Sequence, residues 1–113
     1  MHELSLCQTL LRIVEEQAAA LPCSRITKIN LEFGVLAAID RSAFEFAFEA
    51  ASQGTIAAQA TLHFIEIAGQ GFCESCQKSM QLLRVYDPCD TCAQSGLQIT
   101  QGNELRIQSM EVI

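Results

Sequence analysis

The strongest constraint in this sequence is a pair of Cys-x-x-Cys motifs. Cys73 and Cys76 form the first, Cys89 and Cys92 form the second, and twelve residues separate them. Each short loop can turn both of its sulfurs toward one point, and a hairpin made of the intervening residues would bring the two loops together. Four thiolates that meet in this way are the usual ligand set of a closed, structural zinc site. The sequence therefore predicts a four-cysteine zinc site.

Three other uses of these cysteines compete with zinc. Disulfides need an oxidising compartment and normally a signal peptide, whereas the chain opens with Met1-His2-Glu3-Leu4 and has no basic leader or long apolar run. A redox-active Cys-x-x-Cys needs only one pair, at a junction of strand and helix. An iron centre of the rubredoxin kind uses the same four sulfurs, so the spacing leaves iron as an alternative.

Length and charge restrict the class of protein further. A chain of 113 residues forms one small domain, or one domain with a subdomain. Its formal charge is −6 with only seven Lys and Arg, which argues against a nucleic-acid-binding ribbon, because such ribbons present a basic face. No stretch approaches the roughly 18 apolar residues of a membrane span. We therefore expect a soluble, cytoplasmic protein with reduced cysteines that binds neither nucleic acid nor membrane.

The residues before the cysteine segment predict two amphipathic helices. The first spans residues 3–21 and is stopped by Pro22. Its apolar stripe, spaced by three and four, consists of Leu4, Cys7, Leu11, Val14, Ala18 and Leu21. Asp40 is suited to cap the second helix, and Gly54 is expected to end it. The buried face of this second helix consists of Phe44, Ala47, Phe48 and Ala51.

Alternating side chains predict strands on both sides of the second helix. Period-two patterns run over residues 27–33 and 60–67. Further strands are expected over residues 97–100 and 104–112. Residues 80–86 are expected to form an apolar arm of the zinc hairpin.

Together these elements predict an α+β fold. Two helices would pack on a mixed sheet to form a two-layer body, and the four-cysteine segment would be inserted into it as a zinc-ribbon-like subdomain. The body would be a discontinuous α/β domain made of residues 1–68 plus 100–113. The zinc-binding domain would comprise residues 69–99.

The first three residues carry a second and different group of metal ligands. The amine of Met1, the imidazole of His2 and the backbone nitrogens up to Glu3 can close adjacent chelate rings on one ion. Imidazole and nitrogen ligands in a tetragonal arrangement suit nickel or copper, not the tetrahedral zinc of an all-thiolate cage. The competing interpretation is that His2 is a solvated terminal side chain, and the residues alone leave both interpretations open.

Motifs spread over essentially the whole chain point to a known family. They are MHELSLC at residues 1–7, Glu32-Phe33-Gly34, Phe46-Ala47-Phe48-Glu49, the paired Cys-x-x-Cys motifs and GNELRI at residues 102–107. In this order and spacing the sequence resembles the HypA/HybF family of nickel metallochaperones. The resemblance implies a cytoplasmic accessory protein that delivers nickel to the large-subunit precursor of nickel-iron hydrogenase and works with a partner GTPase. Some relatives also serve urease, and the resemblance allows a homodimer.

The resemblance also implies which residues bind each metal. Nickel, the transported ion, would be held by the amine of Met1, by His2 and by nearby backbone nitrogens with Glu3 adjacent. Zinc, the structural ion, would be held by the four cysteines of the paired motifs. The remaining candidates are not expected to bind metal. Cys7 should be a small core residue, Cys23 a free thiol, and His63 a hydrogen-bonded or solvated histidine.

Two other functions are weighed against nickel delivery. The alternative is an adaptor protein whose zinc ribbon only binds protein or nucleic acid. This alternative predicts no nickel affinity and no effect of an N-terminal extension. An enzyme is not expected, because two His far apart in the sequence and no nucleophile motif leave no catalytic set to assign. A zinc ion with four thiolates also has no open position for water.

Overall fold

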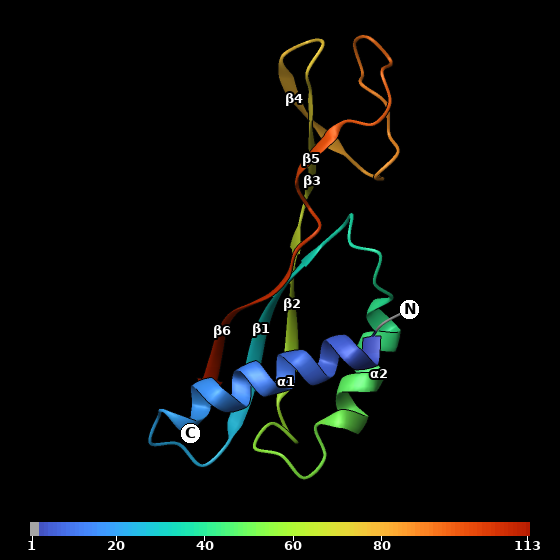
Figure 1. The fold of residues 1–113 in the computed structure, drawn as a ribbon. Coiled ribbons are helices and arrows are strands. Elements are labelled where there is room, and N and C mark those ends of the chain that lie inside the picture. The colour runs from blue at the N-terminus through green and yellow to red at the C-terminus, as the bar shows by residue number, and fades with distance from the viewer. Residues whose placement is uncertain (1–2) are drawn as a thin grey trace. The chain divides into compact units, whose positions relative to one another are not determined.

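A computed structural model describes residues 3–113, which form two helices and two three-stranded sheets. In chain order the elements are α1 (Glu3–Ala19), β1 (Ile26–Gly34), α2 (Arg41–Ala51), β2 (Thr61–Ile67), β3 (Gly69–Cys73), β4 (Lys78–Leu82), β5 (Gln98–Gln101) and β6 (Leu105–Val112), as Figure 1 shows. The strand orders are β2-β1-β6 and β4-β3-β5. The predicted α+β class is confirmed.

The residues cluster into two compact units. Unit 1 consists of Met1–Leu31, Ala38–Phe64 and Arg106–Ile113. Unit 2 consists of Glu32–Ala37 and Ile65–Leu105. The expected division into residues 1–68 plus 100–113 and residues 69–99 stays a prediction.

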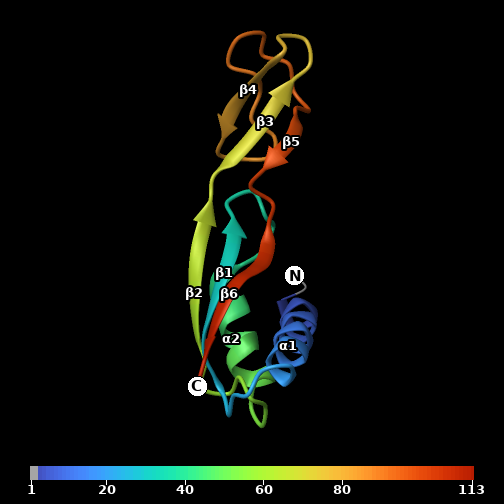
Figure 2. The same cartoon turned by 90° about the vertical axis from the view of Figure 1, so that its left-hand side faces the viewer.

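In unit 1, α1 and α2 lie on the same side of sheet β2-β1-β6 (Figure 2). The buried side chains of α1 are Cys7, Leu10, Leu11, Val14 and Ala18. The predicted stripe is therefore correct in its centre and wrong at both ends, where Leu4 and Leu21 are exposed. Leu4 lies in the first turn of the helix, and Leu21 lies beyond its end at Ala19, so neither continues the buried stripe.

The start of α2 is set by the predicted cap. Asp40 has an extended backbone, and its Oδ1 accepts a hydrogen bond of 3.1 Å from the backbone N–H of Ala43. Phe44 and Phe48 are buried, as expected for the inner face. The ring of Phe44 meets that of Phe64 edge to face at 6.2 Å, which fastens α2 to β2.

Sheet β2-β1-β6 is mixed, as predicted. The side-chain amide of Asn30 in β1 donates to Ser109 Oγ in β6 at 2.9 Å, and Lys28 in β1 pairs with Glu111 in β6. Strands β1 and β6 are therefore antiparallel. Strands β1 and β2 are parallel, because Asn30 contacts His63 and, further along both strands, Val35 N–H donates to the carbonyl oxygen of Ile67. The parallel pair requires a crossover, and α2 provides it.

Unit 2 is built around β3, a strand that the sequence analysis did not predict. It pairs antiparallel with β4 and with β5. Two positions of β3 are glycines, and a side chain at either would collide with Leu82 of β4. A Cβ on Gly69 would lie 2.4 Å from the carbonyl oxygen of Leu82, and a Cβ on Gly71 would lie 2.6 Å from Leu82 Cδ1. These glycines therefore allow β4 to pack closely on β3.

The core of unit 2 combines apolar residues with two of the cysteines. Its buried members are Leu36, Cys73, Leu82, Cys89 and Leu97, with Cys76, Met80 and Ile99 packed against them. The apolar arm expected over residues 80–86 is wrong beyond Leu82, because β4 ends there and the next apolar side chains are exposed. Two of the four predicted metal ligands, Cys73 and Cys89, are thus part of the hydrophobic core, whereas Cys92 is exposed.

Candidate metal centre

The four cysteines of the paired motifs converge in unit 2. Cys73 ends β3, Cys76 lies in the turn between β3 and β4, and Cys89 and Cys92 lie in the loop between β4 and β5. The turn and the loop lie side by side in both views (Figures 1 and 2). All four Sγ atoms lie within 4.8 Å of one another. The structure therefore brings together the four cysteines that the spacing predicted to be zinc ligands.

The sulfur geometry suits a tetrahedral zinc ion. Zinc–sulfur bonds of about 2.3 Å in a tetrahedron place the sulfurs about 3.8 Å apart. The Sγ atoms of Cys73 and Cys92 are 3.7 Å apart, and those of Cys76 and Cys89 are 3.8 Å apart. Both distances far exceed a disulfide bond of about 2.05 Å, and all of these cysteines are free thiols. The site accordingly fits a structural zinc ion held by four thiolates.

The pKa values of the cysteine thiols also favour a bound cation at this site. Backbone N–H groups of Cys92 and Thr91 lower the pKa of the Cys89 thiol to about 6, and the Thr91 nitrogen lies 3.4 Å from Cys89 Sγ. Hydrogen bonding to the neighbouring sulfurs, Cys92 foremost, raises the pKa of Cys76 to about 12. Four thiolates at this separation repel one another, so a divalent cation is required to keep all of them deprotonated.

A polar clasp, made of Lys78, Asp90 and Thr91, connects the two cysteine loops. Lys78 Nζ lies 2.8 Å from Asp90 Oδ1 and also donates to Thr91 Oγ1. The Thr91 hydroxyl donates to the same Asp90 oxygen at 3.0 Å. Asp90 raises the pKa of Lys78, and Lys78 lowers the pKa of Asp90. The sequence analysis missed this clasp, although a lysine two residues after one motif and an acid inside the other is a signal that it could have used.

Comparison with known proteins identifies the family. Residues 1–112 match the family model described as hydrogenase/urease nickel incorporation, metallochaperone, hypA. The chain belongs to the HypA family. The hydrogenase maturation factor HypA of Legionella pneumophila (strain Lens) is 42% identical over 112 residues, which cover 99% of each chain. The factor of the same name from Azotobacter vinelandii is 40% identical over 112 residues with the same coverage.

Solved structures agree with this assignment. The solution structure of the Ni metallochaperone HypA from Helicobacter pylori is 28% identical, covers 100% of this chain and 98% of that one, and has a TM-score of 0.71. A second solution structure, of HypA protein, has a TM-score of 0.72 at 28% identity. The resemblance drawn from the sequence is confirmed: this HypA-family member is a hydrogenase nickel-incorporation metallochaperone, and it works with the hydrogenase maturation machinery.

The nickel ligands predicted at Met1 and His2 lie outside the described residues. Glu3 is described as the first residue of α1, and its Oε2 accepts a hydrogen bond of 3.4 Å from the backbone N–H of Asp40. The Glu3 carboxylate is therefore engaged at the start of α2. Nickel binding by the Met1 amine, His2 and the backbone near Glu3 stays a prediction.

The remaining cysteines and histidine have structural partners within unit 1. Cys7 Sγ donates to the carbonyl of Phe44 at 3.4 Å, and burial raises the pKa of its thiol to about 11. Cys23 Sγ donates to the carbonyl of Ala18 at 3.5 Å. His63 Nδ1 lies 2.9 Å from Asn30 Oδ1. Across residues 3–113, the four-sulfur cluster is the one group of three or more His, Cys, Asp or Glu that is arranged to hold a metal.

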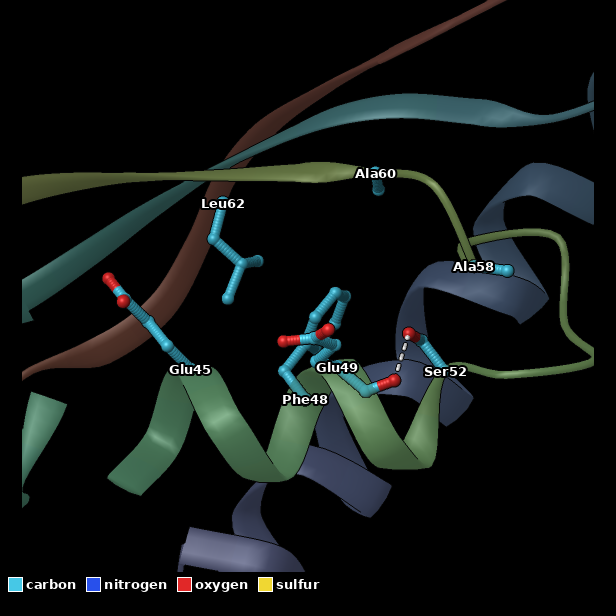
Figure 3. Close-up of a pocket in the computed structure, with 7 residues that line it drawn as sticks. All are labelled: Glu45, Phe48, Glu49, Ser52, Ala58, Ala60 and Leu62. Carbon is cyan, nitrogen blue, oxygen red and sulfur yellow. Dashed lines mark hydrogen bonds between the residues drawn. The ribbon is translucent and has the colours of Figure 1, made fainter. Parts of the chain in front are cut away.

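Unit 1 also contains a pocket of about 330 Å³ between α2 and the start of β2 (Figure 3). Phe48 and Leu62 point into it, and Glu45 and Glu49 stand at its edge. Glu45 is already paired with Arg41 at 3.3 Å. The lining holds no cysteine or histidine, so the pocket lacks the nitrogen and sulfur ligands that nickel prefers.

Neither α1 nor α2 has the length and apolar character to cross a bilayer.

Proposed function

We propose that this chain carries nickel at its amino terminus and delivers it to the large-subunit precursor of a nickel-iron hydrogenase. The match to the HypA family over residues 1–112 carries the proposal, because it includes both the cysteine pairs and the first three residues. The four-sulfur site supports a division of labour between two metals. Four thiolates make a closed site that suits a resident zinc ion, which leaves the cargo to be bound elsewhere.

The nickel site consists of the amine of Met1, the imidazole of His2 and the backbone nitrogen of Glu3. These groups form adjacent chelate rings, and nitrogen ligands in a tetragonal arrangement favour nickel. The hydrogen bond from Asp40 N–H to the Glu3 carboxylate supports a role for the Glu3 backbone rather than its side chain. Amine and imidazole must lose their protons to bind, so nickel affinity decreases as pH falls through about 8 to 6.

Transfer requires that nickel leave while zinc stays. Ligands at a chain end are released by a local change of a few residues. In contrast, Cys73 and Cys89 are buried in the core of unit 2, so their release requires opening of that core. The two sites therefore differ in how readily they give up their ions.

The chain acts as a carrier in the cytoplasm and not as an enzyme. Reduced cysteines at zinc-like distances suit a reducing compartment, and a zinc ion with four thiolates offers no position for a reacting water. Its partners are the hydrogenase large-subunit precursor and a maturation GTPase.

A pair of histidine variants tests the proposal. His2→Ala should abolish nickel binding and nickel transfer to the large-subunit precursor, while zinc content and circular dichroism stay unchanged. His63→Ala is the matched control and should retain nickel, because His63 contacts Asn30 on the sheet. Nickel affinity that is unchanged in His2→Ala would refute the assignment. The alternative, a zinc-ribbon adaptor without nickel delivery, predicts that the wild-type chain does not bind nickel either.

A further inference from the structure

A short turn follows β4 and has a fixed conformation. Arg84 accepts a backbone hydrogen bond from Asp87 N–H at 3.1 Å, which closes a four-residue turn. The Asp87 carboxylate accepts three more, from Leu83 N–H at 2.9 Å, Arg84 N–H at 3.0 Å and Arg84 Nε at 3.1 Å. Pro88 follows and restricts the backbone further. We use the name 83–86 turn for residues 83–86, which are the residue before this turn and the first three residues of the turn itself.

The 83–86 turn exposes apolar side chains where polar ones are usual. Val85 and Tyr86 occupy the two central positions between Arg84 and Asp87, and such positions normally favour Gly, Pro, Asn, Asp or Ser. Leu83, Val85 and Tyr86 are 70%, 54% and 70% exposed. The Arg84 guanidinium lies 5.2 Å from the centre of the Tyr86 ring and supports it from one side. Folding of unit 2 therefore fixes an apolar group in water without burying it.

The geometry points to a docking site on the 83–86 turn for a protein of the hydrogenase maturation machinery that presents an apolar pocket bordered by Lys and Arg. Tyr and Arg are the residue types enriched among the side chains that dominate binding energy at interfaces. A turn held by four hydrogen bonds loses little conformational freedom on binding, so more of the contact energy appears as affinity. This inference rests on the proposed function, which supplies the class of partner.

The net negative charge of unit 2 favours a partner whose pocket is bordered by basic residues. Its acidic residues are Glu32, Glu66, Glu74, Asp87, Asp90 and Glu104, against only Lys78 and Arg84. Both cations are already paired, Lys78 with Asp90 and Arg84 with Asp87. Zinc with four thiolates adds two further negative charges. A second copy of unit 2 would be repelled, whereas a basic border would be attracted.

Binding of single variants to purified partners tests this site. The zinc-loaded chain is measured by biolayer interferometry against immobilised large-subunit precursor and, separately, against the maturation GTPase. Tyr86→Ala should raise Kd at least about tenfold for one of these proteins. Phe46→Ala is the matched control: it removes an aromatic ring that is 75% exposed on α2, and it should leave both affinities unchanged. Kd for the affected partner should also rise with salt.

A second variant separates the conformation of the turn from its side chains. Asp87→Ala keeps Leu83, Val85 and Tyr86 but removes the acceptor of three hydrogen bonds, so it should weaken the same partner's binding several-fold. The docking site is overturned if the wild-type chain binds neither protein, or if Tyr86→Ala binds both as tightly as wild type. It is also overturned if Tyr86→Ala changes only self-association in sedimentation velocity. Nickel binding by the same samples is read independently, so failure of the carrier function is distinguished from failure of this site.

Discussion

Lys78 and Asp90 form an ion pair, with 2.8 Å between Nζ and Oδ1, that connects the two cysteine loops of the metal centre without using a metal ligand. Lys78 follows the first loop at the start of β4, and Asp90 lies inside the second. The pair places a positive charge beside a cage that carries two negative charges when zinc is bound. It also holds the loops at the spacing that the sulfurs need.

Removal of this clasp should speed the loss of zinc. Both side chains are partly exposed to solvent, which limits the effect, so we expect Lys78→Ala to release zinc to a chelator about two- to fivefold faster. Lys78→Arg should restore most of the wild-type rate. Lys28→Ala, which breaks a similar exposed pair with Glu111 in unit 1, is the control and should leave the rate unchanged. Equal rates for Lys78→Ala and wild type would show that the clasp has no influence on the metal.

Loss of a buried cysteine should cost both zinc and the core of unit 2. Cys73 is fully buried and packs with Leu36, Leu82 and Leu97. We therefore expect Cys73→Ala to bind almost no zinc by metal analysis and to lose amide protection in β3 and β4. The control is Cys23→Ala, whose thiol lies in unit 1 near the end of α1 and should not affect zinc content. Undiminished zinc in Cys73→Ala would count against the four-sulfur site.

A substitution at Gly69 tests the close packing of β3 on β4. A Cβ at this position would lie 2.4 Å from a backbone oxygen of Leu82 and 2.8 Å from Leu36 Cγ, so the strands would have to separate. We expect Gly69→Ala to reduce the free energy of unfolding by about 1–3 kcal/mol, measured by urea denaturation. Gln70→Ala changes the exposed neighbour on the same strand and should have little effect. Equal stability of the two variants would contradict the packing described here.

The 83–86 turn should depend on the charge of Asp87. Hydrogen bonds from Leu83 N–H, from Arg84 N–H and from the Arg84 side chain lower the pKa of Asp87. Because the pKa of Asp87 is lower in the folded chain, its charge stabilises the folded turn at pH values above the pKa of an unfolded Asp, about 3.9. This stabilisation is lost as pH falls through the lowered pKa. The amide signals of Leu83 and Arg84 should therefore shift in NMR spectra only below about pH 4. A midpoint above that value would be inconsistent with these bonds.

The sequence predicted the parts of this fold that follow from periodicity and spacing. The cysteine pairs, the Asp40 cap and the mixed sheet were all predicted. The sequence also predicted the strand at Thr61–Ile67 and the inner aromatic face of α2. Both patterns arise from burial on one side of a single element.

Two other features were not predicted, because the apolar pattern of the sequence does not report the contacts that determine them. No strand was predicted at Gly69 and Gly71, because glycine is uncommon in strand interiors, whereas here these glycines permit close contact between β3 and β4. Leu83 and Tyr86 were read as part of an apolar arm because their pattern continues that of β4, but the bonds to Asp87 turn the chain into solvent. An apolar run in the sequence does not distinguish a core from an exposed docking turn.

The central claim is that the free amine of Met1 binds nickel together with His2, independently of the zinc site. Metal analysis and calorimetric titration of the untagged, zinc-loaded chain with nickel test this claim most directly, alongside the same chain with two extra residues before Met1. The account predicts about one nickel ion per native-ended chain near neutral pH, and loss of that binding in the extended chain with zinc content unchanged. Equal nickel affinity in the two proteins would contradict it.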